Sequence, residues 1–387
     1  MILYLSSAFK PSLFSDYFER GLVRAGLQAQ RFNSLIIEGI GCVETIYAVG
    51  HPNYANCHDY VSDVKEKDGN IQYYIIGNKN GTFRKVNNFI HLFRLCQSIL
   101  KENKVDVIVC DAISPLYSLT ARLLSKRYHI PSVAIVTDIP IIMDANHISV
   151  MTKISQSLIR MHDGYVLLTK AMNQLVNPCS KPYIIMEGLC DSVDDEDELS
   201  TSANGKEIIL YTGSLSLQTG IENLIEAFKL LNNKDSELWI YGGGKADNYV
   251  KEQAALTDNI KYGGLVSNDE AAKLQRQADI LVNPRPTNLG YVEYSFPSKI
   301  MEYMASGTPV LTTRLPGIPD EYYGFLYSID DDSVDGILHS LSTVLSLNPT
   351  LRKEKGLRAK DFVIKEKNNK KQGERILSLI NNIKQTK

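Results

Sequence analysis

The chain has 387 residues, more than one ordinary hydrophobic core holds and about right for two domains. Hydrophobic residues make up 44% and charged residues 22%, which is the balance of a globular enzyme rather than of a disordered or fibrous chain. The formal net charge of −2 excludes a global basic field of the kind that attracts nucleic acid, so no nucleic-acid partner is expected.

The cysteines and the N-terminal residues favour a cytoplasmic location. None of the six cysteines forms a C-x-x-C pair, so they are predicted to be reduced and mostly packed thiols. His51, Cys57 and His58 lie close together but match no established zinc spacing, so we interpret them as loop and core residues and expect no metal. The chain begins with a short apolar run typical of a buried strand, and no stretch reaches the roughly 18 apolar residues that cross a bilayer. Any membrane contact is therefore expected to be peripheral, at the inner face.

Short apolar runs alternate with amphipathic patterns in the first half of the chain. The runs predict strands at residues 2–5, 44–49, 71–76, 105–110, 132–136 and 165–168. The patterns between them predict helices at residues 28–39, 86–100, 116–128 and 148–161. Such an alternation predicts a parallel sheet with helices on both faces, in an N-terminal domain of residues 1–190.

The acidic stretch 191–206 lacks apolar periodicity and is predicted to be a linker. After it the alternation restarts, with strands predicted at residues 208–212, 237–241, 260–262, 280–283 and 309–312. Helices are predicted at residues 221–231, 249–256, 269–276, 298–305, 333–347 and 351–366, and a last one at 372–383. The predicted fold class is α/β: an N-terminal domain, a C-terminal domain of residues 207–366, and a final segment 367–387. Two doubly wound, Rossmann-like domains would face a central cleft at the carboxyl ends of both sheets.

The most informative stretch is residues 294–310. Ser298 is placed to cap a helix there, and Gly307 to end that helix with a left-handed residue. Lys299 and Glu302 would then share a face with Ser298. A lysine beside the free N–H groups of a helix start is a phosphate-binding arrangement, and a carboxylate one turn later can accept two ribose hydroxyls. The alternative is a surface helix with an ordinary Lys/Glu pair. The Phe-Pro pair before the helix and the Gly-Thr-Pro-Val run after it favour the binding site.

A second stretch, residues 210–228, predicts a strand that runs into Gly213 and a helix that begins near Gly220. Because glycine has no side chain, the backbone at Gly213 and Ser214 can approach a ligand closely at the carboxyl end of the strand. The alternative is an unadorned turn. Glycines at 242 and 244 form only part of a dinucleotide fingerprint, which is a weak signal without the third glycine.

These two stretches, with YGGG at 241–244, YGGL at 262–265 and ADILVNPR at 278–285, follow the order found in the retaining glycosyltransferases of family 4, which the chain resembles. The resemblance is strong across residues 208–315 and mainly architectural before them. It implies the GT-B fold, with a nucleotide sugar on the C-terminal domain and an acceptor on the N-terminal domain. It also implies that the C-terminal helix, in residues 367–387, packs back on the N-terminal domain. It implies no cofactor, because the nucleoside-diphosphate sugar is a co-substrate, for which a UDP-sugar is favoured.

The resemblance also implies roles for individual residues. Glu302 matches the glutamate that holds the ribose hydroxyls, and Gly213 matches the glycine that faces the diphosphate. Residues 296–299 match the loop that touches the phosphates and the sugar, and the segment 262–266 is similar to the one beside the base. The donor-binding residues expected on this basis are Gly213, Ser214, Gly242, Tyr262, Val266, Glu293, Phe296, Ser298, Lys299 and Glu302.

The chain departs from the family at a second glutamate that many relatives carry. That position is Tyr294 here, with Glu293 one residue away. Either Glu293 replaces the missing glutamate through a shifted loop, or backbone groups do its work.

It departs again after Gly213, where many relatives place an arginine and a lysine and this chain has Ser214 and Thr219. The departing diphosphate still needs charge stabilisation, because negative charge grows there in the transition state. Lys299 and Arg285 are the cations expected to supply it. A purely structural role for Arg285, fixing its own loop, is an equal alternative.

In the first half, Asp138 follows a buried strand at the place where many relatives carry a histidine that contacts the donor sugar. It is the best candidate to orient the acceptor hydroxyl or to balance positive charge in an oxocarbenium-like state. The alternative is a turn former. Asp111 and His147 are weaker candidates on the acceptor side. The expected catalytic residues are therefore Asp138, Lys299 and Arg285.

We expect a glycosyltransferase that moves a sugar from a nucleoside diphosphate to a saccharide or lipid-linked saccharide acceptor, with retention, in surface polysaccharide or glycoconjugate assembly. A nucleotide-sugar epimerase and a catalytically silent subunit stay open as alternatives. Four lysines before the last helix are interpreted as a solvated face, with docking to anionic lipid as the alternative; they are Lys365, Lys367, Lys370 and Lys371.

Overall fold

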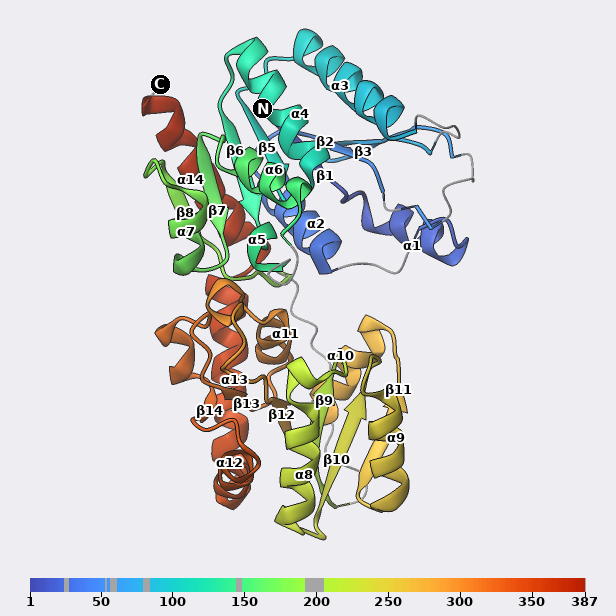
Figure 1. Cartoon of the computed structure of the whole chain (residues 1–387), viewed down its shortest axis with the longest axis vertical. Helices are drawn as coiled ribbons and strands as arrows, with labels where there is room; N and C mark the ends of the chain where they lie inside the picture. The colour runs from blue at the N-terminus through green and yellow to red at the C-terminus, as the bar shows by residue number, and fades with distance from the viewer. Residues whose placement is uncertain are drawn as a thin grey trace. The chain divides into compact units, whose positions relative to one another are not determined.

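The computed structural model describes residues 1–23, 28–52, 54–55, 61–78, 84–143, 148–191 and 205–386. Its internal contacts divide the chain into two compact units: unit 1 is Met1–Ser192 with Asn368–Lys387, and unit 2 is Val193–Lys367 (Figure 1). Most of the predicted linker, residues 192–204, lies outside the described residues, as do Cys57, His58 and His147.

Unit 1 is built on an eight-stranded sheet with the order β3-β4-β2-β1-β5-β6-β7-β8. All neighbouring strands are parallel except β3 and β4, which form an antiparallel pair at one edge. The strands are β1 (Ile2–Ser6), β2 (Ile46–Gly50), β3 (Val64–Asp68), β4 (Ile71–Ile75), β5 (Val107–Asp111), β6 (Ser132–Val136), β7 (Gly164–Leu167) and β8 (Tyr183–Ile185). Every residue of β1, β2, β5, β6 and β7 is buried, as expected of parallel strands covered on both faces.

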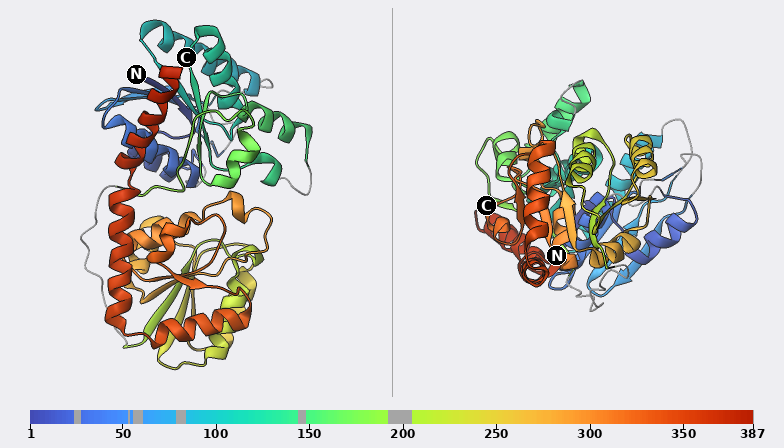
Figure 2. Two further views of the ribbon diagram at one scale, coloured as in Figure 1. Left: turned by 90° about the vertical axis from the view of Figure 1, so that its left-hand side faces the viewer. Right: turned by 90° about the horizontal axis from the view of Figure 1, so that it is seen from below.

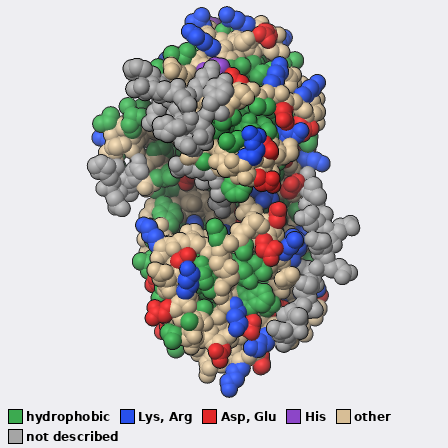
Figure 3. Space-filling view, turned by 90° about the vertical axis from the view of Figure 1, so that its right-hand side faces the viewer, with side chains coloured by type: hydrophobic (Ala, Val, Ile, Leu, Met, Phe, Trp, Pro, Cys, Tyr) green, Lys and Arg blue, Asp and Glu red, His purple; other side chains and the backbone are tan. Residues whose placement is uncertain are grey.

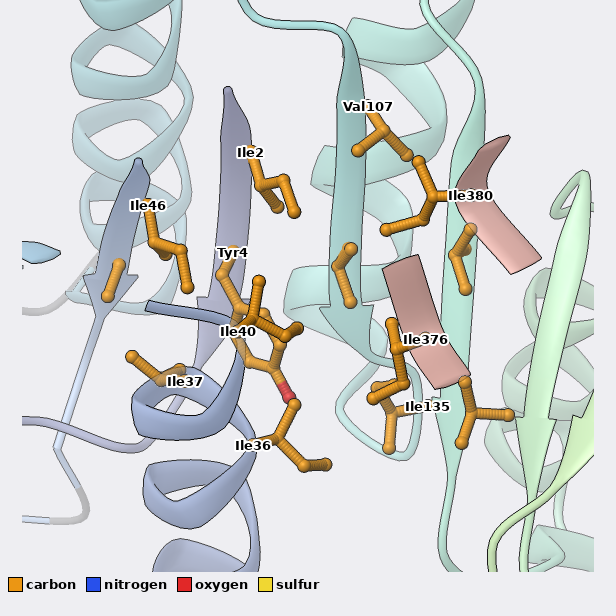
Figure 4. Packing of buried hydrophobic residues seen from close by; sticks show 14 of the residues in the cluster. Ile2, Tyr4, Ile36, Ile37, Ile40, Ile46, Val107, Ile135, Ile376 and Ile380 are labelled. Carbon is orange, nitrogen blue, oxygen red and sulfur yellow. The ribbon is translucent and has the colours of Figure 1, made fainter. Parts of the chain in front are cut away.

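Helices cover both faces of this sheet. They are α1 (Pro11–Glu19), α2 (Gln28–Gly41), α3 (Arg84–Glu102), α4 (Pro115–Tyr128), α5 (Pro140–Met143), α6 (Val150–Ile159), α7 (Lys170–Val176) and α14 (Asn369–Thr386). The last helix, α14, packs beside α2, so the two ends of the chain share one core. Figure 4 shows Ile380 of α14 beside Val107 of the sheet and Ile376 beside Ile135, while Tyr4 lies next to Ile36 and Ile40 of α2.

Unit 2 is built on a six-stranded, wholly parallel sheet with the order β11-β10-β9-β12-β13-β14. The strands are β9 (Glu207–Thr212), β10 (Ser236–Tyr241), β11 (Ile260–Gly264), β12 (Ile280–Asn283), β13 (Val310–Thr313) and β14 (Tyr327–Ile329). The α-helices are α8 (Ile221–Leu231), α9 (Asp247–Leu256), α10 (Asn268–Gln277), α11 (Ser298–Ser306), α12 (Val334–Ser346) and α13 (Pro349–Glu366). Because the strand order reverses direction at β9 and β12, the carboxyl ends of these two neighbours form the edge where a doubly wound sheet binds its ligand.

The structure contains elements that the periodicity of the sequence did not predict. They are short or lie at sheet edges, and include α1, α5, α7, β3, β8 and β14. Strand β3 lies at the edge of the sheet and pairs with β4 alone, and none of its residues is fully buried. Four of its five residues are charged, so the sequence has no apolar run there that would predict a strand.

The surface carries charges of both signs. On the face shown in Figure 3, the Lys and Arg side chains are interspersed with Asp and Glu over both units, in keeping with the net charge of −2. One interpretation of the charged residues was wrong: Lys367 is not on a solvated face. It is buried, its ammonium lies 2.7 Å from the Glu321 carboxylate, and it contacts the rings of Tyr322 and Phe362.

No helix among the described residues is long and apolar enough to cross a membrane. Of the described cysteines, Cys96, Cys110 and Cys190 are buried, whereas Cys42 and Cys179 are exposed.

Candidate functional site

The tip of β9 in unit 2 is shaped by two glycines with positive φ. Gly213 has φ of +132° and Gly242, at the tip of the neighbouring β10, has φ of +141°. The Gly213 amide donates to the Tyr241 carbonyl at 2.8 Å, which ties the two tips together. A Cβ on Gly242 would overlap the Gly213 backbone, and a Cβ on Gly213 would overlap the Lys299 side chain. Only glycine fits at either position, so backbone and one lysine form the surface here.

Tyr262 adds a side chain to this tip from β11. Its hydroxyl donates to the Gly242 carbonyl at 3.0 Å. Val266 follows the end of β11 and is half-buried. Gly242 and Tyr262 therefore meet at the carboxyl ends of β10 and β11, next to Gly213, and Val266 lies two residues beyond β11.

Helix α11 is fixed to β9 through its buried face. Tyr303 is wholly buried, and its hydroxyl accepts a hydrogen bond from the Thr212 amide at 3.0 Å. The Thr212 side chain also accepts from the Gln275 amide at 3.1 Å. The Tyr303 bond holds α11 against the last residue of β9, next to Gly213, and the Gln275 bond holds α10 there.

The N-terminus of α11 differs from its prediction in one detail. Pro297 is the N-cap, and Ser298 is the first helical residue and makes no capping hydrogen bond. A proline here is compatible with the extended conformation that a cap residue needs, so the helix starts without a side-chain acceptor. At the other end Gly307 has φ of +80° and terminates the helix as predicted.

Lys299 reaches from this first turn to the tip of β9. Its ammonium donates to the Tyr211 hydroxyl at 2.6 Å and lies 3.9 Å from the centre of the Tyr211 ring. The Tyr211 hydroxyl in turn donates to the Ser214 carbonyl at 2.6 Å. Tyr211 thus holds both the lysine and the loop after Gly213 in place.

The electrostatic setting of Lys299 is unusual for a lysine. Burial lowers the pKa of its ammonium to about 7, and the nearby Arg285 guanidinium acts in the same direction, while the Glu302 carboxylate opposes both. Burial also raises the pKa of Tyr211 to about 12, although Thr219 and Arg285 work against it. A lysine of this kind can gain its proton when an anion arrives.

Arg285 and Glu302 therefore lie within electrostatic reach of Lys299. Arg285 follows β12 and is half-buried, with its guanidinium carbon 5.9 Å from the centre of the Tyr291 ring. Glu302 is exposed on α11, one turn after Lys299. The structure brings the two predicted cations and the predicted ribose carboxylate together around the Gly213 tip.

Ser214 and Thr219 stand where many family members carry cations. Thr219 accepts from the Ser216 amide at 3.2 Å and donates to the Ser216 carbonyl at 2.7 Å, in a turn that precedes α8. Ser214 is exposed. Neither brings positive charge to the tip.

Two other predicted donor residues lie in the segment before α11. Glu293 is exposed in a short 3-10 turn (Val292–Tyr294) and is hydrogen-bonded to Tyr294, whose pKa this bond raises. Phe296 is buried, with its ring 5.4 Å from that of Tyr322. Phe296 thus anchors the segment through packing.

In unit 1, Asp138 and Asp111 lie at the ends of neighbouring strands. Asp111 ends β5 and Asp138 follows β6, and the two strands are paired. Burial raises the pKa of each carboxyl to about 6, and the negative charge of Asp138 adds to the shift at Asp111. Thr137 donates a hydrogen bond to Asp138, which lowers the pKa somewhat.

Asp111 is also part of a buried hydrogen-bond chain. Its carboxylate accepts from the Ile113 amide at 3.2 Å and from the Asn33 side chain at 3.3 Å. The Tyr4 hydroxyl donates to the Asn33 carbonyl oxygen at 2.7 Å. Both carboxyls thus lie at the carboxyl ends of two neighbouring buried strands, where burial favours their protonated forms.

The sequence reasoning missed Tyr211 and Tyr303, and it gave Asp111 only a minor place. A signal was present for each tyrosine. Tyr211 lies two residues before Gly213 at the end of an apolar strand, and Tyr303 lies beside Glu302 on the apolar side of α11, where a buried hydroxyl must find a partner. No group of three or more metal-ligating side chains occurs in the part of the chain that the structure describes.

Known proteins resemble the chain most clearly in unit 2. Residues 206–346 match the family model described as "Glycosyl transferases group 1". The putative colanic acid biosynthesis glycosyl transferase WcaI of Escherichia coli K12 is 28% identical over 37% of this chain and 37% of its own length. Curated relatives are matched over 26% to 58% of their own lengths, so the alignments cover only part of each.

Solved structures match over the whole chain. Sucrose-phosphate synthase from Thermosynechococcus elongatus superposes with a TM-score of 0.70 at 13% identity, over 100% of both chains. HepE from Anabaena, in complex with UDP and glucose, has a TM-score of 0.63 at 13% identity, over 97% of this chain and 99% of its own. These likenesses confirm the predicted fold class: two parallel-sheet, Rossmann-like units as in GT-B structures.

Proposed function

We propose that the chain is a glycosyltransferase that moves a sugar from a nucleoside-diphosphate sugar to a hydroxyl group of an acceptor. One observation carries this proposal: Lys299, at the first turn of α11, lies against the glycine-lined tip of β9 with Arg285 and Glu302 beside it. This cluster falls inside the residues that match the group 1 glycosyl transferases.

The cluster suits a nucleoside diphosphate. Oxygens of a diphosphate would approach the Gly213 backbone and the start of α11, where helical N–H groups lack intrahelical partners. Lys299 and Arg285 would supply positive charge, and Glu302, one turn further along the helix, would accept the ribose hydroxyls. Tyr262 and Val266 would lie beside the base.

The proposed reaction keeps the configuration of the sugar. The bond between the anomeric carbon and the diphosphate oxygen breaks, the acceptor oxygen bonds to the same face of that carbon, and the acceptor proton passes to the departing diphosphate. Lys299 and Arg285 would stabilise the charge that grows on the leaving oxygen. Asp138, in unit 1, would orient the acceptor or balance charge on the oxocarbenium-like sugar.

The finer assignments belong to the same proposal. Retention and membership of family 4 rest on the motif order and on Glu302, as the sequence indicated. A UDP-sugar donor is suggested by the UDP and glucose bound to HepE, and a role in surface polysaccharide assembly is suggested by the likeness to WcaI. The acceptor is proposed to be a saccharide, free or lipid-linked.

A ligand screen tests the proposal. A thermal-shift and calorimetric comparison of UDP, GDP, ADP and their sugars should single out one nucleotide, because a ligand that binds only the folded state raises its stability. Glu302→Ala should weaken binding of that nucleotide about tenfold or more through the lost ribose hydrogen bonds. Glu354→Ala, an exposed glutamate on α13, is the matched control and should bind as the wild type does.

A turnover assay with the donor that the screen identifies separates the epimerase and the silent subunit from the glycosyltransferase. Incubation with donor alone should yield no epimer, and addition of acceptor should release the nucleoside diphosphate. A wild-type protein whose stability no nucleotide shifts would contradict the proposal.

A further inference from the structure

Lys299 meets a neutral partner, whereas other lysines of the chain meet carboxylates. Its ammonium donates to the Tyr211 hydroxyl at 2.6 Å. The ammonium groups of Lys206, Lys229 and Lys365 lie 3.3, 3.1 and 2.8 Å from carboxylate oxygens. A nearby carboxylate favours the charged, unreactive form of a lysine, and a neutral hydroxyl does so less. Lys299 is therefore better placed than these three lysines to react as a neutral amine.

The hydrogen bonds of Tyr211 leave the lone pair of a neutral Lys299 amine unused by this tyrosine. The Tyr211 hydroxyl donates its one proton to the Ser214 carbonyl at 2.6 Å, so toward Lys299 it acts only as an acceptor. A neutral amine therefore directs an N–H at Tyr211 and its lone pair away from that oxygen. Burial and the Arg285 guanidinium lower the pKa of Lys299 to about 7, while the Glu302 carboxylate opposes them, so roughly half of the amine is neutral near pH 7. Such an amine is a nucleophile.

The tip of β9 around this amine suits a phosphate group. The end of the Lys299 side chain lies directly against the Gly213 backbone, where a Cβ would overlap it. The Arg285 guanidinium is a second cation within electrostatic reach. Helix α11 begins at Ser298, so its first N–H groups, which have no intrahelical partners, lie beside Lys299. A small anion drawn to these groups would therefore bind beside a nucleophilic amine.

We propose that Lys299 is a modification site for small acyl phosphates, which bind through their phosphate at the tip of β9 and transfer their acyl group to the amine. The Lys299 nitrogen attacks the acyl carbon, and a C–N bond forms. The bond between that carbon and the bridging phosphate oxygen breaks, and its electron pair leaves with the phosphate. The departing phosphate takes the proton of the amine, so the products are an amide and inorganic phosphate, and the step needs no further reactant.

Acylation of Lys299 regulates the donor site, and this consequence rests on the proposed function. The amide carries no charge, so the tip loses one of its two proposed cations, together with the contact of the ammonium with the Tyr211 ring, 3.9 Å from its centre. The acylated chain should therefore bind the nucleotide weakly. Donor and acyl phosphate compete for the same groups, so a bound donor protects Lys299 from acylation.

Lys355 in unit 2 is a matched control. It is half-buried on α13, the helix that runs along one side of unit 2 in Figure 2. Its ammonium lies 4.4 Å from the centre of the Tyr327 ring, and burial and the Arg358 guanidinium lower its pKa. It thus shares a tyrosine ring, an arginine and partial burial with Lys299. Tyr327 is the first residue of β14, so Lys355 lies near the amino ends of the strands, whereas the Gly213 tip lies at their carboxyl ends.

Mass spectrometry of the full chain tests the proposal. The protein is treated near pH 7 with acetyl phosphate and, in parallel, with succinimidyl acetate, which acetylates amines but has no phosphate. Peptide analysis then gives the rates of acetylation at Lys299 and at Lys355. The ratio of the Lys299 rate to the Lys355 rate should be at least about tenfold larger with acetyl phosphate, because the cations and N–H groups of the tip concentrate this reagent beside Lys299.

Inorganic phosphate provides a second measurement. It should slow the acetylation of Lys299 by acetyl phosphate and leave that of Lys355 unchanged, because it occupies the tip of β9. Rate ratios that are equal for the two reagents would overturn the proposal, since the phosphate of the reagent would then play no part. A Lys299 that inorganic phosphate does not protect would overturn it as well.

Two substitutions and the wild type keep this inference distinct from the proposed function. Lys299→Gln, which is neutral like the amide, should bind the UDP-sugar at least about tenfold more weakly than Lys299→Arg, which keeps the charge. Selective, phosphate-protected acetylation of a wild-type chain that binds no nucleotide would refute the glycosyltransferase and spare the modification site. A wild-type chain that binds the nucleotide, and whose Lys299 shows no such selectivity over Lys355, would do the reverse.

Discussion

The protonation of Lys299 should make donor binding depend on pH. In the free protein burial and Arg285 lower the pKa of this ammonium to about 7, with Glu302 opposing them. A diphosphate beside the ammonium favours its charged form, so the bound state has a higher pKa than the free state. Binding therefore takes up a proton wherever the free lysine is neutral.

The direction and the size of the change in donor affinity with pH follow from the difference between the two pKa values. Below about pH 7 the free lysine is already charged and the affinity is at its full value. Above about pH 7 each further pH unit raises the dissociation constant at most about tenfold, or ~1.4 kcal/mol in binding free energy. This rise continues until the pH reaches the pKa of Lys299 in the bound state. At about pH 9 the dissociation constant should have risen by up to ~100-fold. Partial exposure of Lys299 to water makes this an upper bound.

The assay is calorimetric titration with a UDP-sugar, whose diphosphate stays fully ionised over the whole range. Repeating it in buffers of different ionisation enthalpy gives the number of protons taken up. Lys299→Met should bind weakly and without this pH dependence, since the titrating group is gone. A wild-type affinity that stays constant from about pH 6 to about pH 9 would refute the reasoning, because it would mean that Lys299 does not meet the diphosphate.

Three further substitutions have expected outcomes. Tyr211→Phe removes the hydroxyl that bonds Lys299 and Ser214 and should destabilise the fold by about 1–3 kcal/mol in chemical denaturation, with weaker donor binding. Gly213→Ala should lower the free energy of unfolding by about 1–3 kcal/mol because of the φ of +132° alone. It should also abolish donor binding, because the new methyl group displaces Lys299; unchanged binding would exclude this tip as the diphosphate site. Asp111→Asn should raise stability at neutral pH by about 1–3 kcal/mol, because the buried carboxyl with its pKa near 6 is ionised there at a cost. That gain should disappear as the pH falls toward about 4, where wild-type Asp111 is protonated in the fold; a gain that is the same at both pH values would contradict the assignment.

Much of the fold was predictable because its signals are local. Buried parallel strands such as β5 and β6 are short apolar runs, and helix α8 packs through Ile221, Leu224 and Phe228 as its period requires. Edge strand β3 and the four-residue helix α5 were not predicted from the sequence. The strand has no run of buried apolar residues, and the helix is too short to show the apolar periodicity of a longer helix. Their positions are set by neighbours distant in sequence, which a single local window does not contain.

The candidate site was predictable in part. Glycine at 213 and the Lys299–Glu302 spacing are readable from sequence, because each reflects a constraint on one short segment. The partners of Lys299 are not readable in this way, since Tyr211 lies 88 positions away and meets it only when β9 and α11 pack together. The raised pKa values of Asp111 and Asp138 likewise arise from burial and from the pairing of β5 with β6.

The departure from the family after Gly213 now has a physical consequence. With Thr219 bonded to Ser216 and Ser214 carrying no charge, positive charge at the tip comes from Lys299 and Arg285. The Arg285 guanidinium disfavours the charged form of Lys299, which is one cause of the low pKa of Lys299. In the proposed complex a diphosphate would remove that conflict by pairing with both cations, so its binding and the charging of Lys299 would be one linked event. In the role proposed for Lys299, which its place at a helix start first suggested, the lysine would therefore gain a proton together with the donor.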